Sequence, residues 1–467
     1  MAKQSLQQLI DSHTQAGLQF LSKRQFLIWF AAASGKLFEG MLIFITGIGF
    51  SLIAADLQLS PTQGGILTGS ILVGILIGSF VFGFLADYLG RKLIFIIEML
   101  LFFFTLLAIY SAQSYGVLLL SFFISGFALG GDYPVAHIII SETMPTQYRG
   151  FIVLSAFSFQ AIGAVTGAIL AYLTLQAHPS DLTVWRLSYL YLSCPAFFLF
   201  LIRFFIPESP HWLVEKNRHA DSLRATSQLL NIPIPNLPIL THSKKQKPTG
   251  YFHELFNQKN IRATILASLP WFLQDLGTYG IGIFTPTVIA TLLSLPAHHN
   301  TNMTILKATE AAYASIFLDC FLLIGVICAI FLVERTGRIP LQITGFIGCA
   351  IGLSLAAFGQ YQIDGTAVIF IICGFIVFNF SNNLGPNTIT YLIAGELFPT
   401  RFRGIGAGFA ASCGKVGASV TAFAFPIVLA TFGLNALLTT LIITSIGGAI
   451  VTAYYRIETT GLNLETL

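Results

Sequence analysis

Eight charged side chains stand inside long apolar runs of this sequence, and they are its most informative residues. If these runs cross a membrane, a charge at the centre of a span costs about 2.5–3.5 kcal/mol on the insertion scale, so such residues usually pair or mark a solute pathway. They are Lys36, Glu39, Glu98, Asp132, Arg186, Asp275, Asp319 and Lys415. Arg186 can reach the interface by snorkelling, and the role of Asp319, which could be a polar helix-packing group, is left open.

Three of these charges fall in two patterns in the first half. Lys36 and Glu39 are three residues apart, on one helix face, so they can pair. Asp132 lies in the stretch 130–134, Gly-Gly-Asp-Tyr-Pro, where the glycines and the proline loosen the helix and open room around the carboxylate. The first half therefore predicts one local ion pair and one carboxylate with space around it.

The second half offers a carboxylate between two aromatic residues, and a lysine. Asp275 is four residues from both Trp271 and Tyr279, so the three share one helix stripe. Core packing is the alternative explanation of such a stripe, and an unpaired aspartate disfavours it. Lys415 lies about 16 Å along its run at about 1.5 Å per residue, close to the membrane midplane. A lysine at that depth suggests an anionic substrate or an acidic partner.

Composition places the apolar runs in a bilayer. Of 467 residues, 55% are hydrophobic and 9% are charged, against about 25% charged in soluble domains. The six cysteines lie in apolar runs without metal-ligand spacing, which predicts packing residues and no metal or cofactor. We find no nucleophile–base pair or phosphate-binding loop, so no enzyme is predicted. The net charge of +4 does not indicate nucleic acid, because the basic residues follow membrane topology.

Runs of about 20 apolar residues predict an all-α integral membrane protein with twelve spans. We place the spans near 27–55, 64–86, 92–111, 115–141, 151–176, 185–206, 262–293, 312–333, 340–359, 366–394, 405–430 and 434–455. The chain then divides into an N-terminal tail, a six-helix bundle, a linker, a second six-helix bundle and a C-terminal tail, at 1–26, 27–206, 207–261, 262–455 and 456–467.

Charge in the loops predicts the orientation. Lysine and arginine gather in alternate loops and in 207–261, whereas the other loops carry only Lys307. By the positive-inside rule, both termini and the linker face the cytoplasm. We therefore expect a multi-pass protein of the plasma (inner) membrane.

The two halves of the sequence repeat one another. Glu142–Gly150 returns as Glu396–Gly404, Asp87–Arg91 returns as Glu334–Arg338, and Pro207–Ser209 returns more loosely as Ile457–Thr459. Repeated halves are typical of secondary transporters, which hold the substrate between the halves near mid-membrane. The repeat predicts two bundles related by pseudo-two-fold symmetry.

A loop between the second and third spans suggests a latch. Asp87 could pair with a basic residue across the cytoplasmic face, and Arg91 with an acidic helix end, so that the halves are held together while the inside is closed. A plain positive-inside turn is the alternative. With their repeat counterparts, the expected latch residues are Gly83, Asp87, Arg91, Arg149, Glu334, Arg338, Glu396 and Arg403.

These segments resemble the major facilitator superfamily (MFS) and, within it, the phosphate:proton symporters. The loop 83–92 resembles the loop signature of the superfamily. The segments that resemble the symporters are Gly130–Pro134, Trp271–Gly280, Gly385–Tyr391 and Gly414–Gly417. Pro207–Pro210 is shared with sugar porters and organic-ion transporters. The resemblance implies the MFS fold and import of phosphate with protons by alternating access.

The same resemblance implies roles for individual residues. The substrate pocket would comprise Tyr133, Gln160, Trp271, Asp275, Tyr279, Asn387 and Lys415, and the proton path would comprise Glu39, Glu98 and Asp132. The sequence departs from the family in the first span, where the family usually has two aspartates three apart. Here these positions are Glu39 and Leu42, and Lys36 replaces an apolar residue.

An anion beside Asp275 would couple to a proton. Two unit negative charges at about 4 Å repel by roughly 4 kcal/mol at an effective dielectric constant of 20. A proton on Asp275 removes this repulsion, so anion and proton should each favour binding of the other by the same factor. The expected partners are a small anion, protons and the bilayer, without nucleic acid, for a chain that works as a monomer. The alternatives are a proton-coupled carrier of sugars or organic ions, or a receptor that transports nothing.

Overall fold

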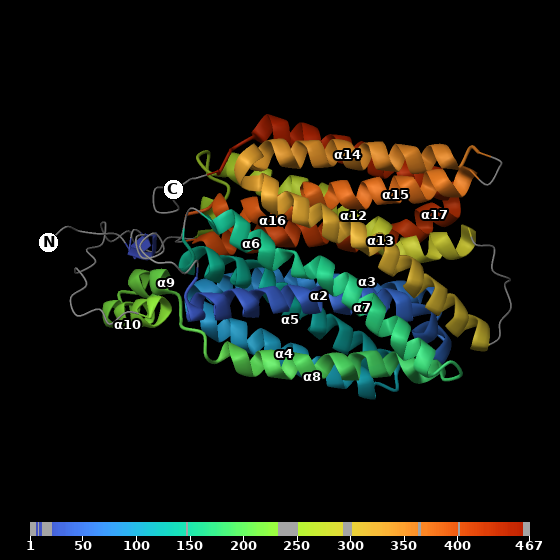
Figure 1. Cartoon of the computed structure of the whole chain (residues 1–467), viewed down its shortest axis with the longest axis horizontal. Helices are drawn as coiled ribbons and strands as arrows, with labels where there is room; N and C mark the ends of the chain where they lie inside the picture. The colour runs from blue at the N-terminus through green and yellow to red at the C-terminus, as the bar shows by residue number, and fades with distance from the viewer. Residues whose placement is uncertain are drawn as a thin grey trace.

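The computed structural model describes residues 6–7, 9–11, 21–145, 148–231, 251–292, 301–362, 366–399 and 402–460. Long helices run side by side along the longest axis of the molecule (Figure 1). The helices of the first half form one bundle, and those of the second half lie beside them as another.

Serine caps begin several helices of the first bundle. Ser22, Ser60 and Ser114 each accept a hydrogen bond from a backbone N–H three residues on, which satisfies a donor that the first helical turn leaves free. The helices of this bundle are α2 (Lys23–Asp56), α3 (Pro61–Leu89), α4 (Arg91–Ser111), α5 (Tyr115–Thr143), α6 (Arg149–Phe157), α7 (Phe159–Ala177) and α8 (Trp185–Arg203). The short 3-10 helix η2 (Leu182–Val184) precedes α8.

The second bundle repeats this arrangement. Its helices are α12 (Ile261–Leu292), α13 (Thr301–Thr336), α14 (Arg338–Gly359), α15 (Thr366–Leu384), α16 (Pro386–Glu396) and α17 (Arg403–Tyr455). Gly433 has non-helical angles, φ 78° and ψ 174°, and divides α17 into two long parts. Only glycine adopts such a φ readily.

The described residues between the bundles form three short helices: α9 (Pro210–Glu215), α10 (His219–Leu230) and α11 (Tyr251–Glu254). Helices α9 and α10 sit at the end of the molecule where α2 begins and α17 ends, which we call the terminal face (Figure 1). The hydroxyl of Ser22 donates to the Leu229 carbonyl at 2.5 Å and ties α10 to this face. The terminal face thus holds the start of α2, the end of α17 and the linker helices α9 and α10. Two bundles of six spans each require this placement.

The helices agree with the expected spans in order and number, with local differences. Among the described residues, ten segments are long and apolar enough to cross a membrane; α12 and the first part of α17 supply two further long helices. The span expected at 312–333 begins at Thr301, so Lys307 lies on α13 and not in a loop. The polar residues in the first turns of α13 extend this helix beyond the apolar run.

Two expected spans are each broken in the middle. The span at 151–176 becomes α6 and α7, which meet at Ser158. The span at 366–394 becomes α15 and α16, which meet at Gly385, directly before Pro386. The proline lacks the N–H that would continue the ladder of helix hydrogen bonds.

The two most extensive contacts between the bundles are those of α3 with α17 and of α7 with α13. Small residues allow this approach. A Cβ at Gly83 of α3 would lie 2.8 Å from the carbonyl oxygen of Gly404 in α17, closer than side-chain atoms pack. The glycine of the expected latch therefore serves as a contact between the halves.

Candidate functional site

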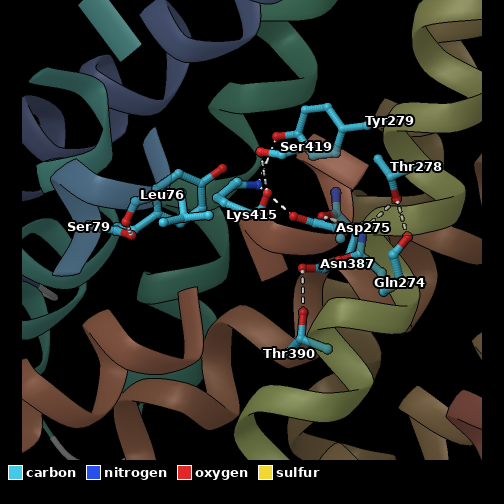
Figure 2. A network of polar contacts seen from close by, with 12 residues as sticks. Leu76, Ser79, Gln274, Asp275, Thr278, Tyr279, Asn387, Thr390, Lys415 and Ser419 are labelled. Carbon is cyan, nitrogen blue, oxygen red and sulfur yellow. Dashed lines mark hydrogen bonds and ion pairs between the residues drawn. The ribbon is translucent and has the colours of Figure 1, made fainter. Parts of the chain in front are cut away.

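The lysine in the first part of α17, before Gly433, is buried in an ion pair. Lys415 Nζ donates to Asp275 Oδ2 and to the Tyr279 hydroxyl, both on α12 and both at 2.8 Å (Figure 2). The side chains of Lys415 and Asp275 are 2% and 1% exposed. The acidic partner expected for Lys415 is therefore present. The expectation that Asp275 is unpaired is wrong, because α17 packs against α12 and brings the lysine to it.

A second buried ion pair lies in the first bundle. Lys36 Nζ donates to Glu39 Oε2 at 2.9 Å, which confirms the expected pair. The other oxygen of Glu39 accepts hydrogen bonds from the Tyr133 hydroxyl of α5 and from the Gln160 amide of α7, the latter at 2.9 Å. The carboxylate of Glu39 thus gathers partners from three helices, as a buried charge needs if it is to be stable.

The two ion pairs meet at one aromatic ring. Lys36 Nζ lies 3.1 Å from the centroid of the Tyr133 ring, and Lys415 Nζ lies 4.8 Å from the same centroid. The Trp271 ring is 5.9 Å from Tyr133, centroid to centroid. A lysine from each half is therefore held over one tyrosine, and a ring face attracts cations. Lys36, which departs from the symporter pattern, is a central member of this cluster.

A cavity of about 90 Å³ lies beside the cluster, between the two bundles. One water needs about 10–15 Å³ on this measure, so there is room for several waters or a small solute. Of the seven substrate residues implied by the resemblance, Gln160, Tyr279 and Asn387 line the cavity. The other four, Tyr133, Trp271, Asp275 and Lys415, are not among its lining residues. The expected pocket is thus part cavity and part packed polar cluster.

Amide and hydroxyl side chains dominate the polar lining of the cavity. Asn387 accepts from the Gln274 amide at 3.2 Å (Figure 2). Asn387 also donates to Asn383 at 3.0 Å, and Asn382 donates to the Thr278 hydroxyl at 2.8 Å. Gln274 also donates to Thr278. Sequence reasoning missed Asn379, Asn382 and Asn383, although three asparagines within five residues of an apolar run were a visible signal.

A third buried charge cluster holds two of the expected proton-path residues. Arg203 donates to Glu98 at 2.8 Å and to Asp132 at 2.9 Å, and all three side chains are at most 1% exposed. Sequence reasoning missed Arg203, because it stands at the last position of α8, where a loop arginine is expected. The sequence predicted space around the Asp132 carboxylate, but this carboxylate packs against α2. A Cβ at Gly35 would lie 2.3 Å from Asp132 Oδ2. The path expected through Glu39, Glu98 and Asp132 is therefore distributed over two separate ion-paired clusters.

At the terminal face, the repeat becomes a pair of matching networks. In the first bundle, Arg91 pairs with Glu142 at 3.3 Å and with Asp87 at 3.0 Å, and Ser209 donates to Glu142 at 2.5 Å. Arg91 thus finds the acidic helix end that the sequence predicts. The backbone N–H of Arg91 donates to Glu208 at 3.0 Å.

The second bundle has the same contacts from its own residues. Arg338 pairs with Glu396 at 3.2 Å and with Glu334 at 2.8 Å, and Thr459 donates to Glu396 at 2.5 Å. The backbone N–H of Arg338 donates to Glu458 at 2.9 Å. Arg91 and Arg338 therefore have equivalent partners in the two halves.

The latch between the halves differs in detail from the expectation. Asp87 reaches across to α17, but its partner there is the backbone N–H of Ile405, at 3.2 Å. A Cβ at Gly150 of α6 would lie 2.2 Å from Glu334 Oε1 of α13, so the second contact is also side chain to backbone. Arg403 donates to the Phe398 carbonyl of its own half at 3.0 Å. Helix ends, more than ion pairs, join the two halves here.

The matching glutamates of the two networks differ electrostatically. Burial raises the pKa of Glu208 above its usual value, despite the N–H donors around it. Burial acts the same way on Glu458, but hydrogen bonds from Thr460 and from the backbone of Arg338 and Ile339 outweigh it and hold the pKa of Glu458 below its usual value. Desolvation favours the neutral acid and hydrogen bonds favour the carboxylate.

Comparison with known proteins decides the family. The sequence matches the family described as "Sugar (and other) transporter" over residues 13–467. The chain belongs to this family. Relatives include the inorganic phosphate transporter PHO84 of Saccharomyces cerevisiae, 28% identical over 83% of this chain and 73% of that one. The major myo-inositol transporter IolT of Bacillus subtilis is 28% identical over 88% and 86%. The inner membrane metabolite transport protein YgcS of Escherichia coli is 27% identical over 91% and 90%.

The fold comparison agrees with this family. The structure of the MFS proton:xylose symporter XylE bound to 6-bromo-6-deoxy-D-glucose matches with a TM-score of 0.77 at 18% identity, over 94% of this chain and 98% of that one. The chain is thus an MFS transporter with twelve membrane helices, a multi-pass integral membrane protein and not an enzyme. The expected superfamily and fold are confirmed, whereas relatives named for phosphate, myo-inositol and other metabolites leave the substrate to be proposed.

Proposed function

We propose that this transporter is a proton-coupled symporter that imports a small anion by alternating access, with inorganic phosphate as the first candidate. The buried pair of Lys415 and Asp275 carries the proposal. The pair holds Lys415, a cation that can bind an anion, beside Asp275, a carboxylate that can accept a proton. Lys415 also contacts the Tyr279 side chain, which lines the cavity.

The pair can couple the two solutes by competition for Lys415. Within the described residues, no hydrogen bond reaches Asp275 Oδ1, so a proton can bind there without displacing a donor. The neutral acid then holds Lys415 only weakly, and the ammonium becomes available to an anion that reaches Tyr279 from the cavity. When the anion leaves, Lys415 needs its carboxylate again, and the proton is released. Anion and proton therefore bind and leave together.

The latch residues would act in the same cycle. The contacts of Asp87 with Ile405, and of Gly83 with Gly404, hold α3 against α17 at the terminal face. Alternating access requires that these contacts open when the site faces that side. The relative named as a phosphate transporter supports phosphate as the first anion to test.

A carrier of hydroxylated metabolites is the second candidate. The observation in its favour is the cavity wall of amides and hydroxyls, which includes Gln160, Thr278, Asn382 and Asn387. Such groups recognise hydroxyl groups of neutral solutes through paired hydrogen bonds. Relatives named for myo-inositol and the xylose symporter fold neighbour fit this candidate.

Uptake into liposomes that contain the purified full-length protein tests the proposal. Labelled phosphate should accumulate when the inside is alkaline, and labelled myo-inositol and xylose should not. Lys415→Ala should abolish uptake, and Lys415→Arg should restore part of it. Asp275→Asn should keep phosphate exchange but lose accumulation driven by the pH gradient, because the amide mimics the protonated acid permanently.

A matched control is Ser419→Ala, since Ser419 lies one turn from Lys415 and bonds only its backbone carbonyl. This variant should transport like the wild type. Accumulation of phosphate by Asp275→Asn to the wild-type level would show that the proton is carried elsewhere. Accumulation of a sugar in place of phosphate would favour the second candidate.

A further inference from the structure

Within the described part of the chain, one carboxylate on the cavity wall has no hydrogen-bond or ion-pair partner. Asp319, on α13, is 5% exposed and lines the cavity, and no hydrogen bond reaches its Oδ2 atom. No ion pair of Asp319 occurs in the described part of the chain. Every other acidic residue inside an expected span, namely Glu39, Glu98, Asp132 and Asp275, is paired with a lysine or arginine.

The groups that face Asp319 are neutral. Around the same cavity, α2 contributes Gly40, Ile43, Phe44, Gly47 and Ile48; α7 contributes Gln160, Ala161 and Ala164; α12 contributes Thr278 and Tyr279; α15 contributes Phe378, Asn379, Asn382 and Asn383. Tyr279 is the titratable group in this set, and its hydroxyl already accepts from Lys415. On α13 itself, Glu310 and Glu334 are several turns away, and α6 and α14 meet α13 at its terminal-face end, around Glu334 and Arg338.

The buried charges around the cavity therefore do not balance, because one negative charge has no positive partner among the described residues. Lys36 with Glu39 and Lys415 with Asp275 are each neutral as pairs, and Asp319 adds a negative charge without a counter-charge. A lone carboxylate buried in a wall of neutral groups is unstable unless something neutralises it. It also repels any anion that enters the cavity.

We propose that Asp319 is a second coupling site, which takes up a proton from the cavity before the anion enters and carries it across with the anion. This rests on the proposed anion symport. The proton binds at Oδ2, where no donor has to be displaced, and the resulting hydroxyl can donate to the anion. A proton on Asp275 frees Lys415 to bind the anion, whereas a proton on Asp319 removes the negative charge from the cavity wall. The two protons therefore have different effects.

The proposal changes the proton stoichiometry. Each anion would cross with one proton more than the Lys415–Asp275 pair supplies, and Asp319→Asn should lose that one proton but still transport. One pH unit corresponds to a factor of ten per coupled proton. At zero membrane potential, Asp319→Asn should therefore accumulate about tenfold less phosphate per pH unit of gradient.

The experiment measures phosphate accumulation in liposomes against the imposed pH gradient, with the membrane potential clamped by potassium and valinomycin. Thr309→Val is the matched control, since Thr309 lies on the same helix but not in the cavity lining, its hydroxyl donates to the Ile305 carbonyl, and it does not titrate. We expect the wild-type slope in Thr309→Val and a slope lower by one proton in Asp319→Asn. An unchanged slope in Asp319→Asn overturns the proposal.

Two further outcomes also overturn it. If Asp319→Asn remains folded but no longer binds phosphate, the aspartate is needed in a form other than the neutral acid. If a sodium gradient drives wild-type uptake and Asp319→Asn abolishes this drive, the carboxylate binds a metal cation and not a proton.

A second measurement separates this proposal from the anion symport. A hydrophobic carbodiimide adds the O–H of a neutral carboxylic acid across its N=C bond, so it marks protonated acids within apolar surroundings. Mass spectrometry of the full-length protein at neutral pH should find this adduct at Asp319 and none at Asp319→Asn. If phosphate is not transported but the adduct forms, only the anion symport fails. If Asp319 stays unmodified while the reagent marks one of the paired acids, Asp319 is not the proton site.

Discussion

Replacement of Arg203 by methionine should destabilise this protein more than replacement of the partly exposed Arg186. Arg203 is fully buried and joins Glu98 and Asp132, at 2.8 and 2.9 Å. Methionine keeps much of the volume but leaves both carboxylates without a cation. Breaking a buried pair by removal of one partner costs about 3–5 kcal/mol, because the remaining charge stays buried.

The expected loss is large on the scale of protein stability. Two carboxylates depend on the one guanidinium, so the cost should reach at least about 3–5 kcal/mol, against a total of about 5–15 kcal/mol for typical domains. Arg186 provides the matched comparison: its pair with Asp56 has a similar length, 2.9 Å, but is partly exposed, at 15% and 17%. An exposed pair contributes about 0–1 kcal/mol, so Arg186→Met should be mild.

The assay compares the detergent-solubilised protein that remains monodisperse after heating at one fixed rate, since membrane proteins commonly unfold irreversibly and only the ranking is meaningful. Arg203→Met should lose monodispersity at a much lower temperature than Arg186→Met. The triple variant Glu98→Gln, Asp132→Asn, Arg203→Met removes all three charges and should recover most of the loss. Equal stability of the two single variants, or no recovery in the triple variant, would refute the reasoning.

Two further predictions concern pH and topology. Because burial raises the pKa of Glu208, its contribution to stability falls as pH rises above the usual range of a glutamate, so Glu208→Gln should gain in apparent melting temperature relative to the wild type as pH rises from that range. The pKa of Glu458 is lowered instead, so its contribution is present above that range and lost as pH falls, and Glu458→Gln should lose stability relative to the wild type as pH rises; parallel curves for the two variants would contradict this. Accessibility tags at the N-terminus, near residue 245 and at the C-terminus should all report cytoplasm, and a tag near residue 300 should report the outside, although these positions lie outside the described residues; an external tag near 245 would overturn the orientation.

Periodicity and repetition gave sound predictions for the fold. Long apolar runs specify helices that cross a bilayer, because every backbone polar group must be bonded inside the helix. The repeat predicted matching positions. In the structure, Glu142 and Glu396 have equivalent partners, each an arginine and a hydroxyl group of its own half. The local pair of Lys36 and Glu39 was predictable because it depends on helix spacing alone.

Contacts between distant helices were not predictable in the same way. The pairing of Asp275 with Lys415 depends on how α12 packs against α17, 140 residues apart in the sequence. Arg203 escaped notice because its position at the end of a span is where a solvated arginine is common, and only the packing of α4, α5 and α8 shows that it is buried. The tasks of Asp132 and Glu98 as proton carriers remain predictions.

What neutralises each buried carboxylate indicates which of them can change charge during transport. Glu98 and Asp132 share an arginine, whose guanidinium stays charged under any physiological condition, so a proton on either acid would leave that cation without its full set of partners. Glu39 and Asp275 each face a lysine near the Tyr133 ring, and a lysine can turn to an arriving anion. Asp319 faces no cation within the described residues and lines the cavity. By this criterion, we expect Asp275 and Asp319 to change charge during transport, with Glu39 as the alternative to Asp275, and we expect Glu98 and Asp132 to stay charged as the fixed frame of the first bundle. The triple variant decides the point: if it folds and still couples uptake to the pH gradient, neither Glu98 nor Asp132 carries the proton.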